Sequence, residues 1–195
     1  MSGTTLKDKL IGCIDLFLFF PRGINAFAGE KRTAIRIFII VHVLLFPLIP
    51  ITAAMVPPVG MEGQNYPFIL KIVLLHDVIT MVSGLWITWL IAGLLEKQHR
   101  FWLGLEASAW CNLLFTTVVM IPLLILDHND MVPDATMQRT YTILACYAYV
   151  FGGTVLYAVY RVNIFLILAW SILGFGIDRE TWNILYALHG LPQLP

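Results

Sequence analysis

The sequence predicts an all-α protein, a polytopic transmembrane helical bundle with four firm spans, a short fifth apolar segment and an N-terminal interfacial helix. Of the 195 residues, 59% are hydrophobic and only 12% are charged, whereas about a quarter of the residues of a soluble domain are charged. Several apolar runs exceed the roughly 20 residues that cross a hydrocarbon core. Basic residues gather before the first of these runs. One membrane-embedded domain follows from these three observations.

Residues 6–20 predict the interfacial helix. Leu10 and Ile14 fall on one side of it, Lys7 lies elsewhere, and Pro21 closes the segment. The helix is too short to span a bilayer, and its charged start favours the headgroup region. A helix that packs under the bundle is the open alternative. With the basic connector that follows, residues 1–33 form the predicted cytoplasmic N-terminal segment.

Four apolar runs predict the spans. Pro47 and Pro50 are expected to kink the first, and Pro122 the third, because proline removes a backbone donor inside a helix. The four runs cover residues 35–56, 67–95, 101–126 and 140–160.

The apolar segment 162–177 is the fifth. It has only about sixteen residues, and Arg161 alone separates it from the preceding span. A short outward span and a segment along the inner interface both remain open. The predicted transmembrane bundle therefore covers residues 34–177, and residues 178–195 are predicted to form a short amphipathic tail.

Basic residues also predict the orientation. Six lie before or at the very start of the first span, the next loop has none, and Lys97 and Arg100 follow the second span. Loops rich in Lys and Arg stay in the cytoplasm. The N-terminus of this integral membrane protein is therefore predicted to be cytoplasmic.

A polar stripe inside the second span is the candidate site. His76, Asp77, Thr80 and Ser83 recur at spacings of three and four, which places them near one helix face. An aspartate at bilayer depth costs roughly 2.5–3.5 kcal/mol on insertion scales, so a partner is expected. Helix rise predicts hydroxyl donors to Asp77 at similar depth on the third and fourth spans. The candidate intramembrane cluster is His76, Asp77, Thr80, Ser83, Thr116, Thr117, Tyr147 and Tyr149.

Two readings of this stripe compete. Polar groups in membranes often hold helices together, and intramembrane ionisable groups often mark proton or ion pathways. Adjacent helical residues point about 100° apart, so His76 is expected to be a poor direct partner of Asp77. Glu106, one turn inside the third span, is expected to pair with Arg100 or Lys97.

Sequence features give no support for a cofactor, a metal or a catalytic site. His42 and His76 suggest two haem ligands, but helix rise separates their predicted depths by roughly 10 Å. No GxSxG, HExxH or glycine-rich phosphate loop occurs. The basic residues are dispersed, so nucleic-acid binding is not expected. A non-enzymatic protein is favoured, although enzymatic activity stays an open question.

The order of segments resembles the Ypt-interacting-protein (YIP) membrane family. The resemblance rests on LFLFFPRGINAF at residues 16–27, GEKRTAIR at 29–36, and four or five closely spaced spans after them. It implies a cytoplasmic N-terminus and a compact bundle, and the compact chain with its short loops is compatible with a bacterial YIP-like protein, for which the inner membrane is the expected location. Eukaryotic members are linked to vesicle traffic and small GTPases, but their DLYGP-type signature is replaced here by DLFLFFP at 15–21, so GTPase binding is not implied.

These features predict a non-enzymatic integral membrane scaffold or an accessory subunit of a membrane complex. The expected partners are the lipid bilayer and other membrane helices, either of another protein or of a second copy of this chain. A small ion- or proton-coupled transporter or channel that uses His76 and Asp77 is the alternative. An enzyme acting on a lipid ranks behind both.

Overall fold

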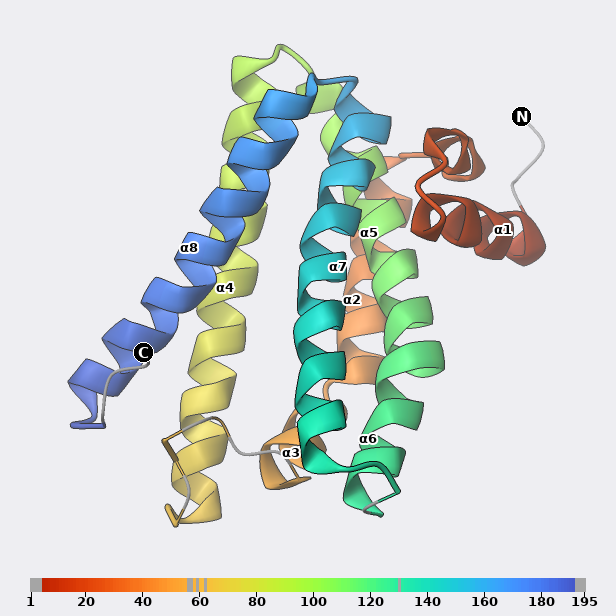
Figure 1. Cartoon of the computed structure of the whole chain (residues 1–195). Coiled ribbons are helices and arrows are strands. Elements are labelled where there is room, and N and C mark those ends of the chain that lie inside the picture. The colour runs from red at the N-terminus through yellow and green to blue at the C-terminus, as the bar shows by residue number, and fades with distance from the viewer. Residues whose placement is uncertain (1–4, 56–57, 59, 62, 130, 192–195) are drawn as a thin grey trace.

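The computed structural model describes all residues except 1–4, 56–57, 59, 62, 130 and 192–195, and every regular element among the described residues is a helix (Figure 1). In chain order these are α1 (Leu6–Phe17), η1 (Pro21–Ala26), α2 (Lys31–Leu45), α3 (Leu48–Met55), α4 (Tyr66–Leu94), η2 (Gln98–Arg100), α5 (Phe101–Phe115), η3 (Thr116–Met120), α6 (Ile121–His128), α7 (Asp134–Tyr160) and α8 (Ile164–Leu188). The all-α prediction is confirmed for this part of the chain. The outer ends of the two predicted terminal segments, residues 1–4 and 192–195, lie outside the described part of the chain.

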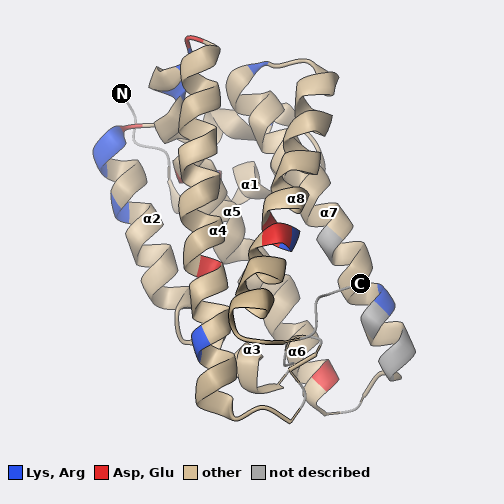
Figure 2. Ribbon diagram, turned by 90° about the vertical axis from the view of Figure 1, so that its left-hand side faces the viewer, with Lys and Arg blue, Asp and Glu red and all other residues tan. Residues whose placement is uncertain are grey.

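Four segments are long and apolar enough to cross a membrane. They are Lys31–Met55, Tyr66–Leu94, Gln98–His128 and Arg139–Tyr160. Each contains nearly all of one predicted span, so the prediction of four helices of spanning length and composition is confirmed. Charged residues are sparse along the middle of these helices (Figure 2).

Prolines interrupt two of the four segments. The first breaks between α2 and α3, around Pro47. In the third, η3 is a π-helical turn directly before α6, whose second residue is Pro122. Pro122 has no N–H, so the preceding turn cannot complete its ordinary i→i−4 bonds and rearranges. Both predicted kinks therefore occur near their prolines.

Helix α8 continues where the sequence suggested a boundary. Asn163 caps its N-terminus by accepting a hydrogen bond from Leu166 N at 2.9 Å. The helix then runs for 25 residues beside α4 in the opposite direction (Figure 1). The predicted division after residue 177 thus falls inside one helix.

Helix α1 lies across the side of the bundle (Figure 1). A capping box fixes its start, because Thr5 and Asp8 exchange hydrogen bonds. The donors of Thr5, its hydroxyl first and its backbone N–H second, lower the pKa of Asp8. Cys13 and Leu16 are buried, whereas large apolar side chains cover the outer side. These exposed residues are Leu6, Leu10, Ile11, Ile14 and Leu18.

Two separate cores hold the molecule together. One lies among α1, η1, α5 and α7 and includes Leu16, Cys111 and Tyr160. The other joins α3, α4 and α8 through residues such as Ile72 and Tyr186. Helices α7 and α8 also pack on each other, so α8 connects the two parts.

Two adjacent glycines of α7 provide a test of the α7–α8 contact. A Cβ on Gly153 would overlap Cγ2 of Ile167, whereas a Cβ on Gly152 would meet nothing within 4 Å. We expect Gly152→Ala to stabilise the protein by roughly 0.5–1 kcal/mol, because alanine favours helix. Gly153→Ala should instead destabilise it by about 1–3 kcal/mol through overpacking. Thermal unfolding in detergent measures both, and equal shifts would contradict the close approach.

Candidate functional site

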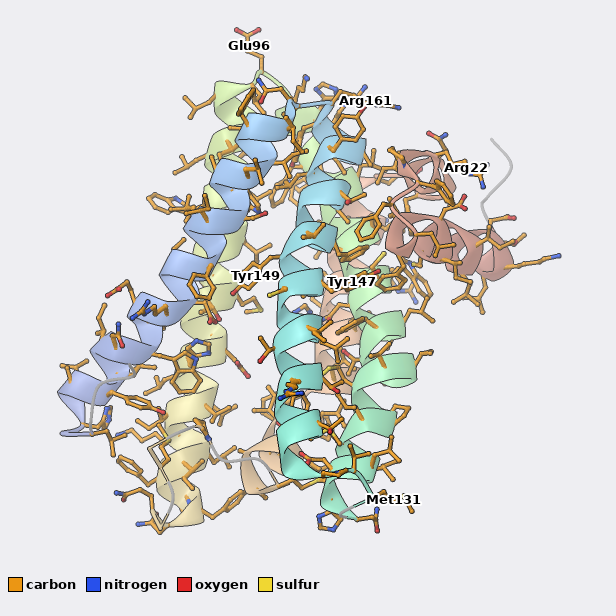
Figure 3. The ribbon with its side chains drawn as sticks, viewed as in Figure 1. Arg22, Glu96, Met131, Tyr147, Tyr149 and Arg161 are labelled. Carbon is orange, nitrogen blue, oxygen red and sulfur yellow. The ribbon has the colours of Figure 1, made fainter. Side chains whose placement is uncertain are left out.

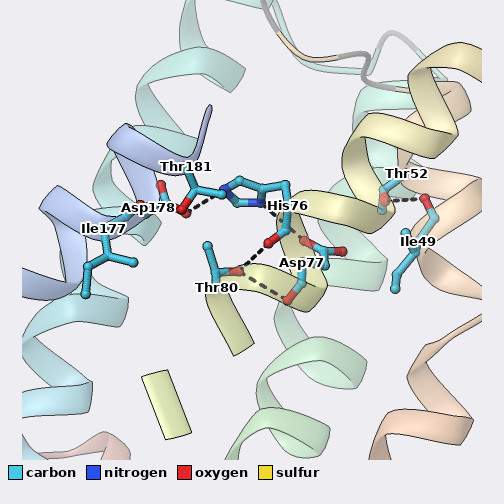
Figure 4. A network of polar contacts seen from close by, with 8 residues as sticks. All are labelled: Ile49, Thr52, His76, Asp77, Thr80, Ile177, Asp178 and Thr181. Carbon is cyan, nitrogen blue, oxygen red and sulfur yellow. Dashed lines mark hydrogen bonds and ion pairs between the residues drawn. The ribbon is translucent and has the colours of Figure 1, made fainter. Parts of the chain in front are cut away.

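A polar cluster joins α4, one of the candidate spans, to α8 (Figure 4). His76 Nδ1 lies 3.5 Å from Asp77 Oδ1. On its other side, His76 Nε2 lies 3.1 Å from Asp178 Oδ1, at ion-pair distance but without the alignment of a hydrogen bond. The imidazole thus stands between two carboxylates from different helices.

Aromatic packing fixes the imidazole ring. His76 is only 6% exposed, and its ring stacks on Trp182 with centroids 4.0 Å apart and planes 16° apart. Asp178 and Trp182 are four residues apart on α8, so they share a helix face. One face of α8 therefore supplies both the carboxylate and the ring that hold His76.

The cluster lies well inside the length of α4. His76 is the eleventh residue of this helix, which places it roughly 15 Å from the helix end. Charged groups at such a depth need partners, because lipid provides no hydrogen bonds. The two carboxylates remain partly accessible, with side-chain exposures of 45% for Asp77 and 42% for Asp178. His76 is therefore paired with both carboxylates, and each carboxylate is also partly exposed.

Two adjoining cavities extend from this cluster. The smaller, of about 200 Å³, is lined by Asp178, Tyr149 and Thr80 among others. A larger cavity of about 430 Å³ shares Thr80 with it and reaches Tyr160 at the end of α7. The hydroxyl of Tyr160 is buried without a hydrogen-bond partner among the described residues.

The predicted candidate residues separate into two groups. His76 and Asp77 lie together in the cluster, Thr80 donates to the carbonyl oxygen of His76 at 2.8 Å, and Tyr149 reaches the smaller cavity. Ser83 is half-buried on α4, and Thr116, Thr117 and Tyr147 have other partners.

Three of the four hydroxyls expected at Asp77, those of Thr116, Thr117 and Tyr147, are bonded elsewhere. Thr117 donates to Leu113 O at 2.8 Å, inside its own helix. Tyr147 donates to Phe17 O at 2.6 Å and so holds α1. Figure 3 shows Tyr147 and Tyr149 on different sides of α7, as a spacing of two residues in a helix requires. Thr116, Thr117 and Tyr147 therefore do not donate to Asp77, contrary to the prediction for these three residues.

Two partners within the cluster differ from expectation. His76 was expected to be a poor direct partner of Asp77, and its Nδ1 lies 3.5 Å from the carboxylate, at ion-pair distance. Asp178 was missed, since it follows directly after the predicted end of the apolar segment at residue 177. Its spacing of four from Trp182 was the available signal.

A second buried charge ties the N-terminal segment to the bundle. Glu106 of α5 is fully buried. It accepts from Lys9 Nζ at 2.7 Å and from Gly29 N at 2.9 Å. The expected partners are wrong: Lys97 donates to Tyr160 O, and Arg100 donates to Val159 O at 2.9 Å. These two side chains cap α7 instead.

The other candidate ligands are dispersed. His42 Nδ1 donates to Phe38 O of its own helix, 2.8 Å away. Among the described residues, no group of three or more His, Cys, Asp or Glu side chains is arranged to hold a metal ion. Cys13, Cys111 and Cys146 are free thiols.

Fold and site together define a helical protein with four candidate membrane spans and a polar cluster between two of its helices. No family model, curated protein or solved structure matches this chain.

Proposed function

We propose that the protein is a non-enzymatic integral membrane scaffold or an accessory subunit of a membrane complex. The observation that carries the proposal is the use made of the buried polar groups. Glu106 holds Lys9 and the backbone of Gly29, and Tyr147 holds the end of α1. These buried polar groups of α5 and α7 thus serve to join the N-terminal segment to the bundle.

The surfaces of the spans support partners in the membrane. In the most apolar stretch of each candidate span, only 11% to 24% is buried within the chain. Helix α8 also directs large apolar side chains outward, with Phe165 77% exposed and Ile172 71% exposed. Such surfaces suit lipid, helices of another subunit or a second copy of this chain.

The placement of the chain is part of the proposal. We place α8 as a fifth crossing element and α1 in the membrane interface, with the N-terminus in the cytoplasm. The lysines and arginines around the α4–α5 turn and the end of α7 support this orientation. We also propose, from sequence alone, that the chain has a YIP-like organisation and lies in a bacterial inner membrane.

Photo-crosslinking in intact membranes tests the accessory role. A photoreactive residue at Ile172 is expected to capture a defined partner or a second copy in high yield, because this face would be covered in the complex. A second photoreactive residue is placed at Val43 of α2, which is also exposed, to test another span in the same way. Absence of any protein adduct at either position, together with a monomer in mild detergent, would contradict the proposal.

A proton-coupled transporter is the second candidate, and the cluster around His76 favours it. An imidazole between two carboxylates can accept and release a proton, and cavities lead from it toward the end of α7. On this candidate, wild-type protein in liposomes dissipates an imposed pH gradient and His76→Gln does not. Equal rates for both proteins and for empty liposomes would exclude it.

A further inference from the structure

A third cavity lies away from the His76 cluster, where the N-terminal segment meets the bundle. It has a volume of about 510 Å³. The connector around Asn25 and Gly29 forms one wall, and the α4–α5 turn and the end of α7 form the others. Its lining includes three basic residues, His99, Arg100 and Arg161, and no acidic residue.

Two of these basic residues, Arg161 and Arg100, have distinctive local geometry. Arg161 ends α7 in the left-handed conformation, with φ 52° and ψ 47°, which few residues other than glycine and asparagine adopt readily. It lies at the end of the bundle in Figure 3. Arg100 donates from Nη1 to Val159 O. Because a guanidinium has five N–H donors, that bond leaves others to face the cavity.

The nearest buried carboxylate does not compete for these charges. Glu106 accepts from Lys9 at 2.7 Å and from Gly29 N at 2.9 Å, so its charge is already compensated. The cavity therefore has a net positive lining. Arginine forks match phosphate oxygens, and basic pockets at the ends of transmembrane helices suit phospholipid headgroups.

A separate apolar groove lies farther along α5, on the side of the bundle that α1 also covers. A groove of about 490 Å³ is lined by Ile14, Phe17 and Leu114. Leu114 follows Leu103, which lines the basic cavity, by eleven residues of α5, or roughly 16 Å of helix rise. Lipid chains extend to this depth, whereas a free phosphate would not use the groove.

From these features we infer that the cavity between η1, the α4–α5 turn and the end of α7 binds the phosphate of an anionic phospholipid. His99, Arg100 and Arg161 hold the phosphate oxygens. The site is separate from the His76 cluster, so neither the scaffold nor the transport proposal depends on it.

Lipid binding to the purified full chain in neutral detergent tests the inference. Native mass spectrometry with phosphatidylglycerol, phosphatidylcholine or inorganic phosphate measures relative affinity. Wild type is expected to bind phosphatidylglycerol most tightly. Arg161→Asn should weaken that binding about fivefold, which is the contribution of one basic residue near a membrane surface. Asparagine tolerates the left-handed turn, so the fold is kept.

A matched control distinguishes binding in the cavity from general electrostatic attraction of an anionic lipid to the basic residues of the protein. Arg32→Asn removes an equally charged, exposed residue that does not line the cavity, and it should leave affinity within about twofold of wild type. His99→Gln provides an independent variant and should also weaken binding. Equal losses for Arg32→Asn and Arg161→Asn would overturn the inference. So would phosphatidylcholine or inorganic phosphate binding as tightly as phosphatidylglycerol.

Discussion

Lys9→Met is expected to destabilise the protein by about 3–5 kcal/mol, because it leaves the Glu106 carboxylate buried without its counter-charge. Glu106 is fully buried, while Lys9 is 12% exposed in its side chain and lies 2.7 Å from it. Gly29 N alone would then compensate the carboxylate. At roughly 2–4 °C per kcal/mol, the melting temperature in detergent should fall by about 6–20 °C.

Two variants control this experiment. Lys7→Met removes the same charge from an exposed position of α1 and should change stability by less than about 0.5 kcal/mol. The double variant Lys9→Met/Glu106→Leu should recover much of the loss, because replacing both members of a buried pair by apolar groups is often nearly neutral. If Lys9→Met melted like Lys7→Met, the pair would not hold α1 to α5.

Asp178→Leu is expected to loosen the contact of α8 with α4. His76 would keep Asp77 at 3.5 Å from Nδ1 but lose the carboxylate that lies 3.1 Å from Nε2. An unsatisfied buried polar group costs about 1–3 kcal/mol. Asp178→Asn should lose less, because it keeps a polar oxygen of similar shape next to Nε2. Thermal unfolding of both variants in detergent gives the comparison.

Glu180 supplies the matched control for α8. It is exposed and lies two residues from Asp178, so Glu180→Leu alters the same helix without removing the carboxylate at His76. Its melting temperature should stay within about 2 °C of wild type, as for other surface changes. A loss for Glu180→Leu as large as for Asp178→Leu would show that charge on α8, and not the His76 contact, is what stabilises it.

Helix positions could be predicted because they depend on local sequence. The long run that became α4 could be recognised by length alone, since a backbone in lipid must satisfy its hydrogen bonds internally. The breaks at Pro47 and near Pro122 were also predictable, because proline acts on its own helix.

Partners of the buried charges could not be predicted from depth. Helix rise places a residue along a helix axis but leaves open which neighbours it faces. Glu106 therefore looked closest to Arg100 and Lys97, whereas the fold of the N-terminal segment brings Lys9 to it from 97 positions away. Tyr147 likewise turned toward α1 and not toward Asp77.

By itself, the sequence determined that this chain is helical, carries four helices of spanning length and places His76 and Asp77 inside one of them, since hydrophobic length and helical periodicity are local properties. The tertiary structure decided that Asp178 stands across from His76, and that Glu106 meets Lys9. Those pairs depend on how α8 and α1 pack on the bundle, and packing joins residues about a hundred positions apart.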